Sequence, residues 1–228
     1  MSAVDVQLTS GGPNAPRKFL PLLTDVPSKR VAVPDPSVFP WSAVARLDFL
    51  RDGQLISNAS GFLAAPGVVL TAAHNLKQIY DRLDISLGYD ATLNKGVKAV
   101  YRGKNAVHRL RDVAVLLVDP LPMRHFPIGS MATERVTLAG YPENSKRQTA
   151  GNGPCTQKGA LHRYDVNVGQ GDSGAPAFVW DGSNAQCIAV HVQRKLVPEA
   201  GKLLGIGEAL DAVLVGELQD LIDDLMTE

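Results

Sequence analysis

The sequence predicts a mostly β protein that is built from many short strands and ends in one helix. Its 228 residues include 21 glycines and 15 prolines, a content that suits strands and turns better than a helical bundle. Short apolar segments recur between turn signals, and sustained helical spacing occurs only in the last segment. A chain of this length forms one large or two small domains.

The first group of expected strands precedes residue 120. Apolar residues alternate at Val44, Leu47 and Phe49, and Asp52-Gly53 is a hairpin signal. At most one helical turn is expected after His74. The remaining strands of this group are expected at 55–63, 67–73, 83–88, 98–101 and 113–118.

The second group follows a linker at 120–130, where three prolines mark turns. Its strands are expected at 136–142, in a hairpin at 156–166, and at 175–180, 186–192 and 203–210, with a polar loop at 143–153. The tail at 211–226 carries Leu214, Leu218, Leu221, Ile222 and Leu225 at helical spacing. Asp211 is a suitable N-cap, so we expect a helix there.

A serine between glycines is the first candidate for chemistry. The stretch G-Q-G-D-S-G-A-P places Ser173 in a polar turn just before an apolar run. Glycines allow backbone angles and close approaches that a side chain would block. The backbone N–H groups of Gly171 and Ser173 could then converge on a developing oxyanion. A serine is a poor nucleophile without an adjacent base, so a histidine and an orienting acid are required.

Both partners stand upstream at the ends of apolar segments. His74 closes the run V-V-L-T-A-A-H, and Asp112 opens the run D-V-A-V-L-L-V. The contexts T-A-A-H, D-V-A-V-L and G-D-S-G-A-P, with spacings of 38 and 61 residues, resemble the trypsin-like (chymotrypsin-fold) serine proteases. The resemblance runs from about Val31 to the C-terminus. The short spacings and the later Ala189-Val190-His191 are most similar to the V8-like, or glutamyl endopeptidase, branch.

The resemblance implies an all-β fold of two packed six-stranded antiparallel Greek-key β-barrels with a C-terminal α-helix. We accordingly divide the chain into a flexible N-terminal segment or propeptide at 1–30, a first barrel at 31–120, and a second barrel with the helix at 121–228. The two barrels would form one protease unit.

The resemblance also implies a serine endopeptidase that works through an acyl-enzyme intermediate. His74 would act as general base, Asp112 would orient it, and Ser173 would attack the substrate. A catalytically inactive binding module on the same fold is the alternative. An esterase of another fold is disfavoured because Ala175 stands where the G-x-S-x-G turn needs its second glycine.

Four residues are expected to bind the substrate side chain. By the resemblance, Asn167 lies at the bottom of the S1 pocket, where it disfavours Lys or Arg, and Val168 departs from the threonine that is usual in glutamyl endopeptidases. His191 matches the pocket histidine of that branch, and a histidine can carry charge toward a carboxylate. Arg194 could add positive potential at the rim. These residues predict cleavage after Glu, and less often after Asp. The alternative for His191 is a strand histidine that is satisfied by a backbone carbonyl.

A basic pair, Lys29-Arg30, precedes Val31. In the trypsin family, a cleaved N-terminal amine at about this distance pairs with the aspartate before the catalytic serine, here Asp172. One hypothesis is therefore that cleavage after Arg30 frees the Val31 amine for this role. The alternative is an ordinary solvated pair in a linker.

Composition narrows the classes of partner. A formal net charge of zero gives no field that would gather nucleic acid or an anionic membrane surface. No apolar run approaches the length of a membrane span. Under the protease interpretation, the partners are protein or peptide substrates. The N-terminus lacks a basic start and an apolar signal core, so we expect a cytoplasmic protein unless a leader was removed.

No metal site and no cofactor are expected, because the histidines and cysteines lack close ligand spacing and no phosphate-binding loop precedes a helix. Cys155 and Cys187 could form one disulfide or stay as two small buried residues. The sequence does not define the oligomeric state.

Overall fold

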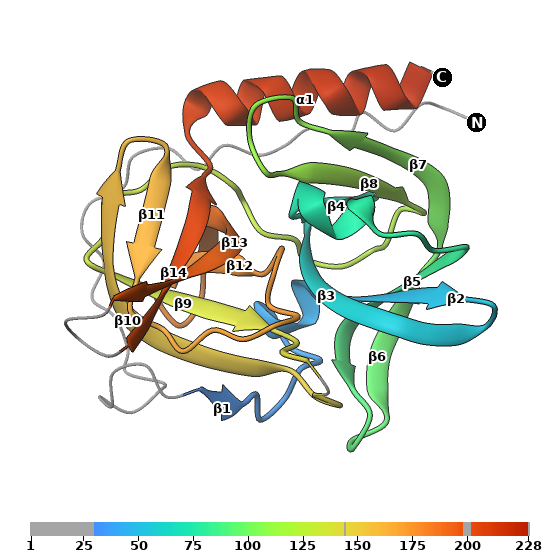
Figure 1. Cartoon of the computed structure of the whole chain (residues 1–228), viewed down its shortest axis with the longest axis horizontal. Coiled ribbons are helices and arrows are strands. Elements are labelled where there is room, and N and C mark those ends of the chain that lie inside the picture. Colours follow the sequence, from blue (N-terminus) through green and yellow to red (C-terminus); the bar gives the residue numbers. More distant parts are fainter. Residues whose placement is uncertain (1–29, 144, 198–201, 228) are drawn as a thin grey trace.

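The computed structural model describes residues 30–143, 145–197 and 202–227. The flexible segment or propeptide expected at residues 1–30 lies outside the described residues except for Arg30, whose side chain is buried against Asp172. The described chain forms fourteen strands, two short 3-10 helices and one α-helix (Figure 1). The predicted all-β architecture with a C-terminal helix is therefore confirmed.

The first sheet is a curled half-barrel of seven antiparallel strands. They are β2 (Val44–Arg51), β3 (Gln54–Ala65), β4 (Val68–Thr71), β5 (Arg82–Asp90), β6 (Lys95–Ala99), β7 (Tyr101–Val107) and β8 (Ala114–Val118). Their order is β6-β5-β2-β3-β4-β8-β7. Only Val100 separates β6 from β7, so the chain itself joins the two edges where a closed barrel would have hydrogen bonds.

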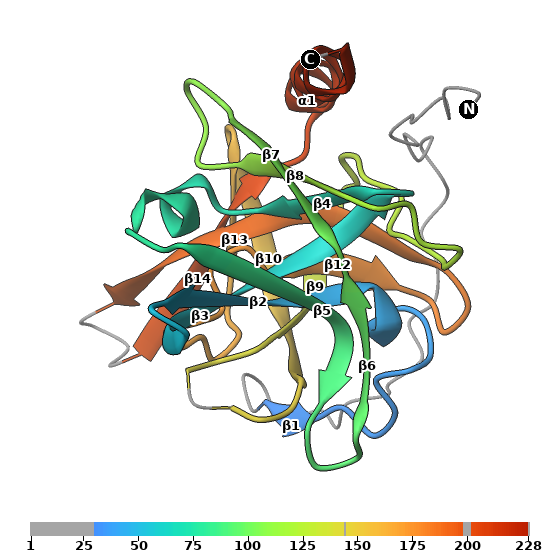
Figure 2. The ribbon, with the colours of Figure 1, turned by 90° about the vertical axis from the view of Figure 1, so that its right-hand side faces the viewer.

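The second sheet contains a closed six-stranded barrel. Its strands are β1 (Val31–Ala32), β9 (Arg135–Gly140), β10 (Thr149–Lys158), β11 (Leu161–Tyr164), β12 (Pro176–Trp180), β13 (Ala185–Val197) and β14 (Lys202–Ala209). Their order is β1-β10-β11-β14-β13-β12-β9, and β10 also pairs with β9, which closes the barrel and leaves β1 as an addition to β10. Figure 2 shows the two sheets from the side.

Several segments differ from the sequence prediction, and two of these differences involve β10. The start of β10 falls in the expected polar loop at 143–153, because Gly153 lies so close to the Asp165 carbonyl that a Cβ at position 153 would overlap it. The glycines that suggested a loop therefore allow a close strand crossing. β1 belongs to the range predicted for the first barrel but pairs with β10 of the second sheet, with Val31 opposite Ala150.

A cluster of aromatic side chains joins the two sheets. Phe126, in the linker between the barrels, is buried, and its ring centroid lies 5.7 Å from that of Phe62 in β3 and 5.1 Å from that of Phe178 in β12. Trp41, in the η1 helix (Trp41–Ala43), packs edge-on against Phe178. Because the cluster takes rings from both sheets, it fixes how the two halves sit against each other.

The C-terminal helix α1 (Ala212–Thr227) forms as predicted. The Asp211 carboxylate accepts the Leu214 N–H at 2.9 Å, which makes Asp211 the N-cap. The helix buries one apolar stripe, formed by Leu214, Leu218, Ile222 and Leu225, and packs across β7 and β8 of the first sheet (Figure 1). In the described part of the chain, no helix has the length and apolar character needed to cross a bilayer.

The two cysteines form no disulfide. Cys155 and Cys187 are both free and both buried. Burial raises the pKa of Cys155 to about 11 and also raises the pKa of Cys187. Of the two alternatives that the sequence leaves open, the structure shows two buried thiols, which stay protonated at neutral pH.

Replacing Phe126 with Ala should lower the free energy of unfolding by about 3–5 kcal/mol, because it empties the ring position shared by both sheets. Urea denaturation followed by tryptophan fluorescence would measure this. The exposed Ile79 provides a control, since Ile79→Ala should change the free energy by less than about 0.5 kcal/mol. Equal stability of the two variants would contradict the role given to the aromatic cluster.

Candidate active site

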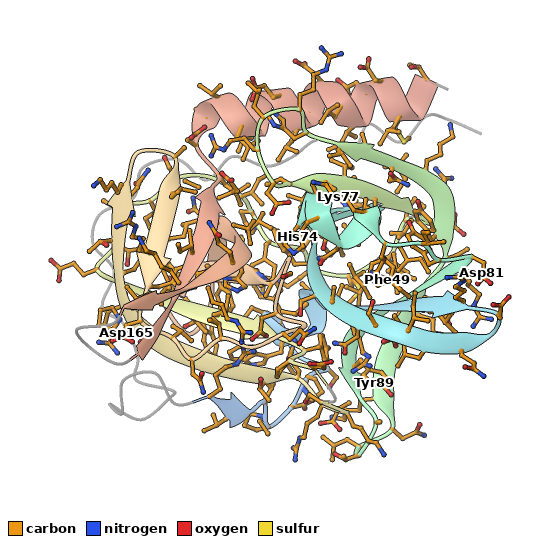
Figure 3. The ribbon with its side chains drawn as sticks, in the orientation of Figure 1. Phe49, His74, Lys77, Asp81, Tyr89 and Asp165 are labelled. Atoms are coloured by element: carbon orange, nitrogen blue, oxygen red, sulfur yellow. The ribbon has the colours of Figure 1, made fainter. Side chains whose placement is uncertain are left out.

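The ends of two neighbouring strands bring His74 and Asp112 together. β4 and β8 pair antiparallel, with Thr71 opposite Ala114. The last residue of β4 and the first residue of β8 therefore lie side by side, at the same end of the first sheet. The η2 helix (Ala73–Lys77) follows β4 and carries His74, which lies between the two sheets in Figure 3. Asp112 stands two residues before β8.

Both oxygens of Asp112 accept hydrogen bonds from His74. The imidazole Nδ1 lies 2.6 Å from Oδ2, and the His74 backbone N–H donates to Oδ1 at 2.9 Å. An ionised carboxylate only accepts hydrogen bonds, so Nδ1 carries the proton and Nε2 is left as the basic atom. The two side chains are 37% and 34% exposed, which leaves the pair open to a substrate.

The surroundings of Asp112 favour its charged form. Partial burial raises the pKa of the carboxyl, but the hydrogen bonds from His74 and the charges of His74 and Lys77 outweigh it, and the net shift is downward. The carboxylate is therefore ionised at neutral pH and holds the imidazole in one orientation.

Arg111, the neighbour of Asp112, connects this end of the first sheet to the second sheet. Arg111 Nε donates to Glu208 at the end of β14 over 2.6 Å, and its Nη2 donates to the Ala209 carbonyl at 2.8 Å. Arg111 Nη1 also lies 3.5 Å from the carboxylate of Asp211, the cap of α1. Sequence reasoning missed Arg111, since its partners lie about a hundred residues away and leave no local pattern.

The backbone of the serine turn rests on the first sheet. The Ser173 carbonyl accepts the Ser60 N–H at 2.9 Å and Asn75 Nδ2 at 3.0 Å. Asn75 follows His74 in the η2 helix, so Ser173 is held beside the segment that carries the imidazole. Ser60 and Asn75 were not among the predicted site residues, because a single polar residue within a strand or a short helix has no distinctive pattern.

Gly174 makes this close seating possible. Its φ is +88°, and a Cβ there would lie 2.1 Å from the Ser60 carbonyl oxygen and 2.2 Å from Thr71 Oγ1. Both atoms belong to the first sheet, and one is backbone that cannot move aside. Only glycine therefore allows the turn to approach β3 and β4.

The turn leaves two N–H groups available. The Gln170 carbonyl accepts the Glu143 N–H. Since the carbonyl and the N–H of a trans peptide point in opposite directions, the Gly171 N–H is directed away from Glu143. Within the described part of the chain, the Gly171 and Ser173 N–H groups have no protein acceptor. N–H groups without a protein acceptor are one requirement of the predicted oxyanion site.

The structure does not join all three candidate side chains by hydrogen bonds. Across the described residues, no hydrogen bond connects the His74 imidazole with the Ser173 hydroxyl, although their backbone segments are adjacent. Hydrogen bonds at catalytic sites are often long in the absence of substrate and tighten when it binds.

The predicted pocket residues have unequal exposure. Asn167 and Arg194 are exposed, whereas Val168 and His191 are buried. The His191 Nδ1 lies 2.7 Å from the Tyr164 hydroxyl, and the ring also hydrogen-bonds the backbone of Ile206.

These surroundings correct one sequence expectation. Burial, assisted by the nearby charge of Arg30, lowers the pKa of His191 to about 3. His191 is therefore neutral near pH 7, and the positive charge expected of it toward a carboxylate is absent. The sequence could not show this, because Tyr164 and Arg30 are distant along the chain.

The basic pair also differs from its expected setting. The Arg30 guanidinium is not solvated but lies against the Asp172 carboxylate, with Nη1 2.6 Å from Oδ2. Val31, whose freed amine was the expected partner of Asp172, pairs with Ala150 inside the β1–β10 ladder. Lys29 lies outside the described residues.

A metal centre has no obvious donors in the described ranges, where no group of three or more His, Cys, Asp or Glu side chains could hold an ion. The nearest pair of soft donors is Cys155 and His162, with Sγ 3.4 Å from Nδ1. Both are buried, and burial raises the pKa of the thiol and lowers that of the imidazole. The pair is therefore neutral.

The two sheets, with an imidazole–carboxylate pair and a serine turn between them, define a chymotrypsin-like protease fold. The family described as "Trypsin-like peptidase domain" matches residues 59–190, which is more than half of the chain and includes His74, Asp112 and Ser173. The chain belongs to this family of trypsin-like peptidases. The comparison with curated protein sequences gave no match.

Two solved structures show the same fold. The protease Anisep from Arthrobacter nicotinovorans aligns with a TM-score of 0.61 and 14% identity, over 88% of this chain and 100% of that one. The scabies mite inactivated protease paralogue S-I1 aligns with a TM-score of 0.63 and 15% identity, over 80% of this chain and 95% of that one. These identities show the fold alone, so the V8-like branch stays a prediction.

Gly174→Ala should lower the free energy of unfolding by about 2 kcal/mol or more, since the new Cβ meets backbone at a positive φ. Thermal unfolding in a calorimeter would measure the loss. Gly216→Ala is the matched control, because a Cβ there meets nothing within 4 Å and its helical position favours alanine. A Gly174→Ala variant as stable as Gly216→Ala would show that the turn does not need this close seating.

Proposed function

We propose that this protein is a serine endopeptidase that cleaves peptide bonds through His74, Asp112 and Ser173. The observation that supports it best is the two-point hydrogen bond of Asp112 to His74, beside the seated Ser173 turn. A surface histidine does not need both its ring and its backbone held by one carboxylate. A general base does, because its free nitrogen must face one direction.

The proposed reaction follows from these positions. The Ser173 hydroxyl attacks the substrate carbonyl while His74 Nε2 takes its proton, and Asp112 stabilises the imidazolium. The negative charge on the carbonyl oxygen is met by the N–H groups of Gly171 and Ser173. His74 then gives its proton to the leaving amine, which leaves an acyl group on Ser173. A water molecule, deprotonated by His74, then attacks this ester. The bond between the acyl carbon and Ser173 Oγ breaks, the acyl group leaves as a carboxylic acid, and His74 returns its proton to Oγ.

An inactive binding module is the second candidate. It is favoured by the missing side-chain hydrogen bond between His74 and Ser173 in the described structure, and one similar structure is named an inactivated protease paralogue. Against it, the three residue types and the free N–H groups of the turn are all present.

A fluorophosphonate probe should label the wild-type chain at Ser173, as mapped by mass spectrometry, and peptide hydrolysis should accompany labelling. Ser173→Ala and His74→Ala should each lower kcat by about 10⁴-fold or more, because the residues act as a unit. Ser183→Ala, in the exposed β12–β13 turn, is the control and should keep wild-type rates. A folded wild-type chain that neither labels nor cleaves would support the binding module instead.

We further propose a preference for Glu, and less for Asp, at P1, which rests on the exposed guanidinium of Arg194. His191 contributes only as a neutral ring, because its pKa lies near 3. Asn167 adds an exposed polar side chain and no charge, while the apolar Val168 is buried.

The ratio of kcat/KM for peptides with Glu and Gln at P1 should therefore stay constant from pH 8 to pH 6, since His191 would gain a proton only near pH 3. Arg194→Ala should lower this ratio by about two- to fivefold, as an exposed charge pair contributes little. Lys195→Ala is the control, because adjacent residues of a strand point to opposite faces. A ratio that rises on acidification, or a preference for Phe over Glu, would contradict the proposal.

A further inference from the structure

The carboxylate beside the candidate nucleophile has a buried cationic partner. The Asp172 side chain is fully buried and that of Arg30 is 8% exposed, and Nη1 lies 2.6 Å from Oδ2. A buried carboxylate without a partner is strongly unfavourable, so an ion pair at this position constrains whatever carries it. Here the carrier is the loop at residues 169–174, which we call the oxyanion loop.

Further contacts fix both members of the pair. Asp172 Oδ2 accepts the Gly169 N–H at 2.8 Å, which ties the side chain to the start of its own loop. Arg30 Nη2 donates to the Thr149 carbonyl of β10 at 2.7 Å. The guanidinium therefore joins the oxyanion loop to the wall of the second barrel.

The pair acts on the atoms that matter for the proposed reaction. Asp172 lies between Gly171 and Ser173, whose two N–H groups form the candidate oxyanion site. Holding the Asp172 side chain inside the protein limits the rotation of the peptide units on either side. A loop whose Asp172 turned out to solvent would carry at least one of these N–H groups away from the site.

We propose that Arg30 of the uncleaved chain is a positioning residue, which holds the oxyanion loop in its working shape so that no cut after Arg30 is needed. This inference rests on the proposed function. It replaces the activation hypothesis drawn from the sequence. The cation at Asp172 is already supplied, and a freed Val31 amine would have to leave the β1–β10 ladder and displace the guanidinium.

The burial of Arg30 also opposes cleavage after it. A protease that recognises a basic side chain must enclose it, and this one is inside the protein and bonded to two partners. Val31, by contrast, is 38% exposed. In the folded chain the recognition element is therefore hidden while its neighbour is accessible.

The test compares the full-length wild type, Arg30→Met, Arg30→Lys and a chain that begins at Val31. Arg30→Met keeps the apolar part of the side chain and removes the charge. It should lower kcat and the fluorophosphonate labelling rate by about 10- to 100-fold, which is less than the loss of a whole oxyanion donor, with KM within about threefold. Arg30→Lys should recover most of the rate, and the chain that begins at Val31 should be as slow as Arg30→Met.

Arg135→Met is the matched control, because Arg135 is half-buried on β9, bonds Asn152 and has no recorded contact with the oxyanion loop. It should keep the wild-type rate. A purely structural role for Arg30 would lower the unfolding midpoint of Arg30→Met and leave the kcat of the folded fraction unchanged, which would overturn the proposal. A chain beginning at Val31 that matches or exceeds the full-length rate would also overturn it, in favour of the amine.

If Arg30→Met does not fold, intact-mass analysis of the labelled wild type decides. Labelled protein that still contains residues 1–30 supports the proposal, and label found only on chains beginning at Val31 overturns it. Failure of the wild type to label at all would instead refute the proposed function, so the two failures can be told apart.

Discussion

The seating of the Ser173 turn against the first sheet is the contact on which the candidate site depends. Ser173, the proposed nucleophile, belongs to the second barrel, whereas His74 and Asp112, the proposed base and its orienting acid, belong to the first sheet. Two hydrogen bonds to the Ser173 carbonyl, from Ser60 and Asn75, hold the turn on the other half. Because Asn75 follows His74, the same short helix carries the proposed base and anchors the proposed nucleophile. The aromatic cluster around Phe126 keeps the two halves in this relation.

Two aspartates near the site have different surroundings and different roles. Asp112 lies at an open edge and is a third exposed, and its charge is held by His74. Asp172 is sealed inside the second barrel with Arg30. An open carboxylate can follow the charge of the imidazole during a reaction, while a sealed one can only fix geometry. Burial therefore separates the proposed chemical acid from the proposed structural one.

The sequence predicted those parts of the site that are set by local pattern. His74 and Asp112 each stand beside a run of apolar strand residues, and Ser173 stands in a glycine turn, so each could be found within eight residues. Most of the strands and the cap of α1 could be predicted for the same reason. The start of β10 could not, because its glycines are typical of loops and the close crossing with Asp165 is visible only in three dimensions.

The residues that contact the candidate site from distant parts of the chain could not be predicted from the sequence, for a related reason. Arg30 meets a residue far along the chain, and His191 is neutral because of Tyr164 and Arg30, to which no spacing rule points. The expected strand at 98–101 is divided between β6 and β7, which lie at opposite edges of the first sheet. This division likewise depends on the pairing of distant strands. Contacts of this kind depend on how distant segments come together in the fold. No short sequence pattern encodes that arrangement.

The hydrogen bonds and ion pairs of Arg111 link the C-terminal segment to the candidate active site. The Arg111 guanidinium, next to Asp112 in the chain, donates hydrogen bonds to Glu208 and to the Ala209 carbonyl. It also makes a longer contact with the cap of the final helix. The helix itself packs across β7 and β8 of the first sheet, the half of the molecule that contains Asp112. The C-terminal segment is thus connected to the position of Asp112 by the Arg111 side chain and by the Glu208 carboxylate, which also accepts the Asp112 N–H at 3.5 Å. A displacement of the final helix would reach the Asp112 carboxylate through these contacts.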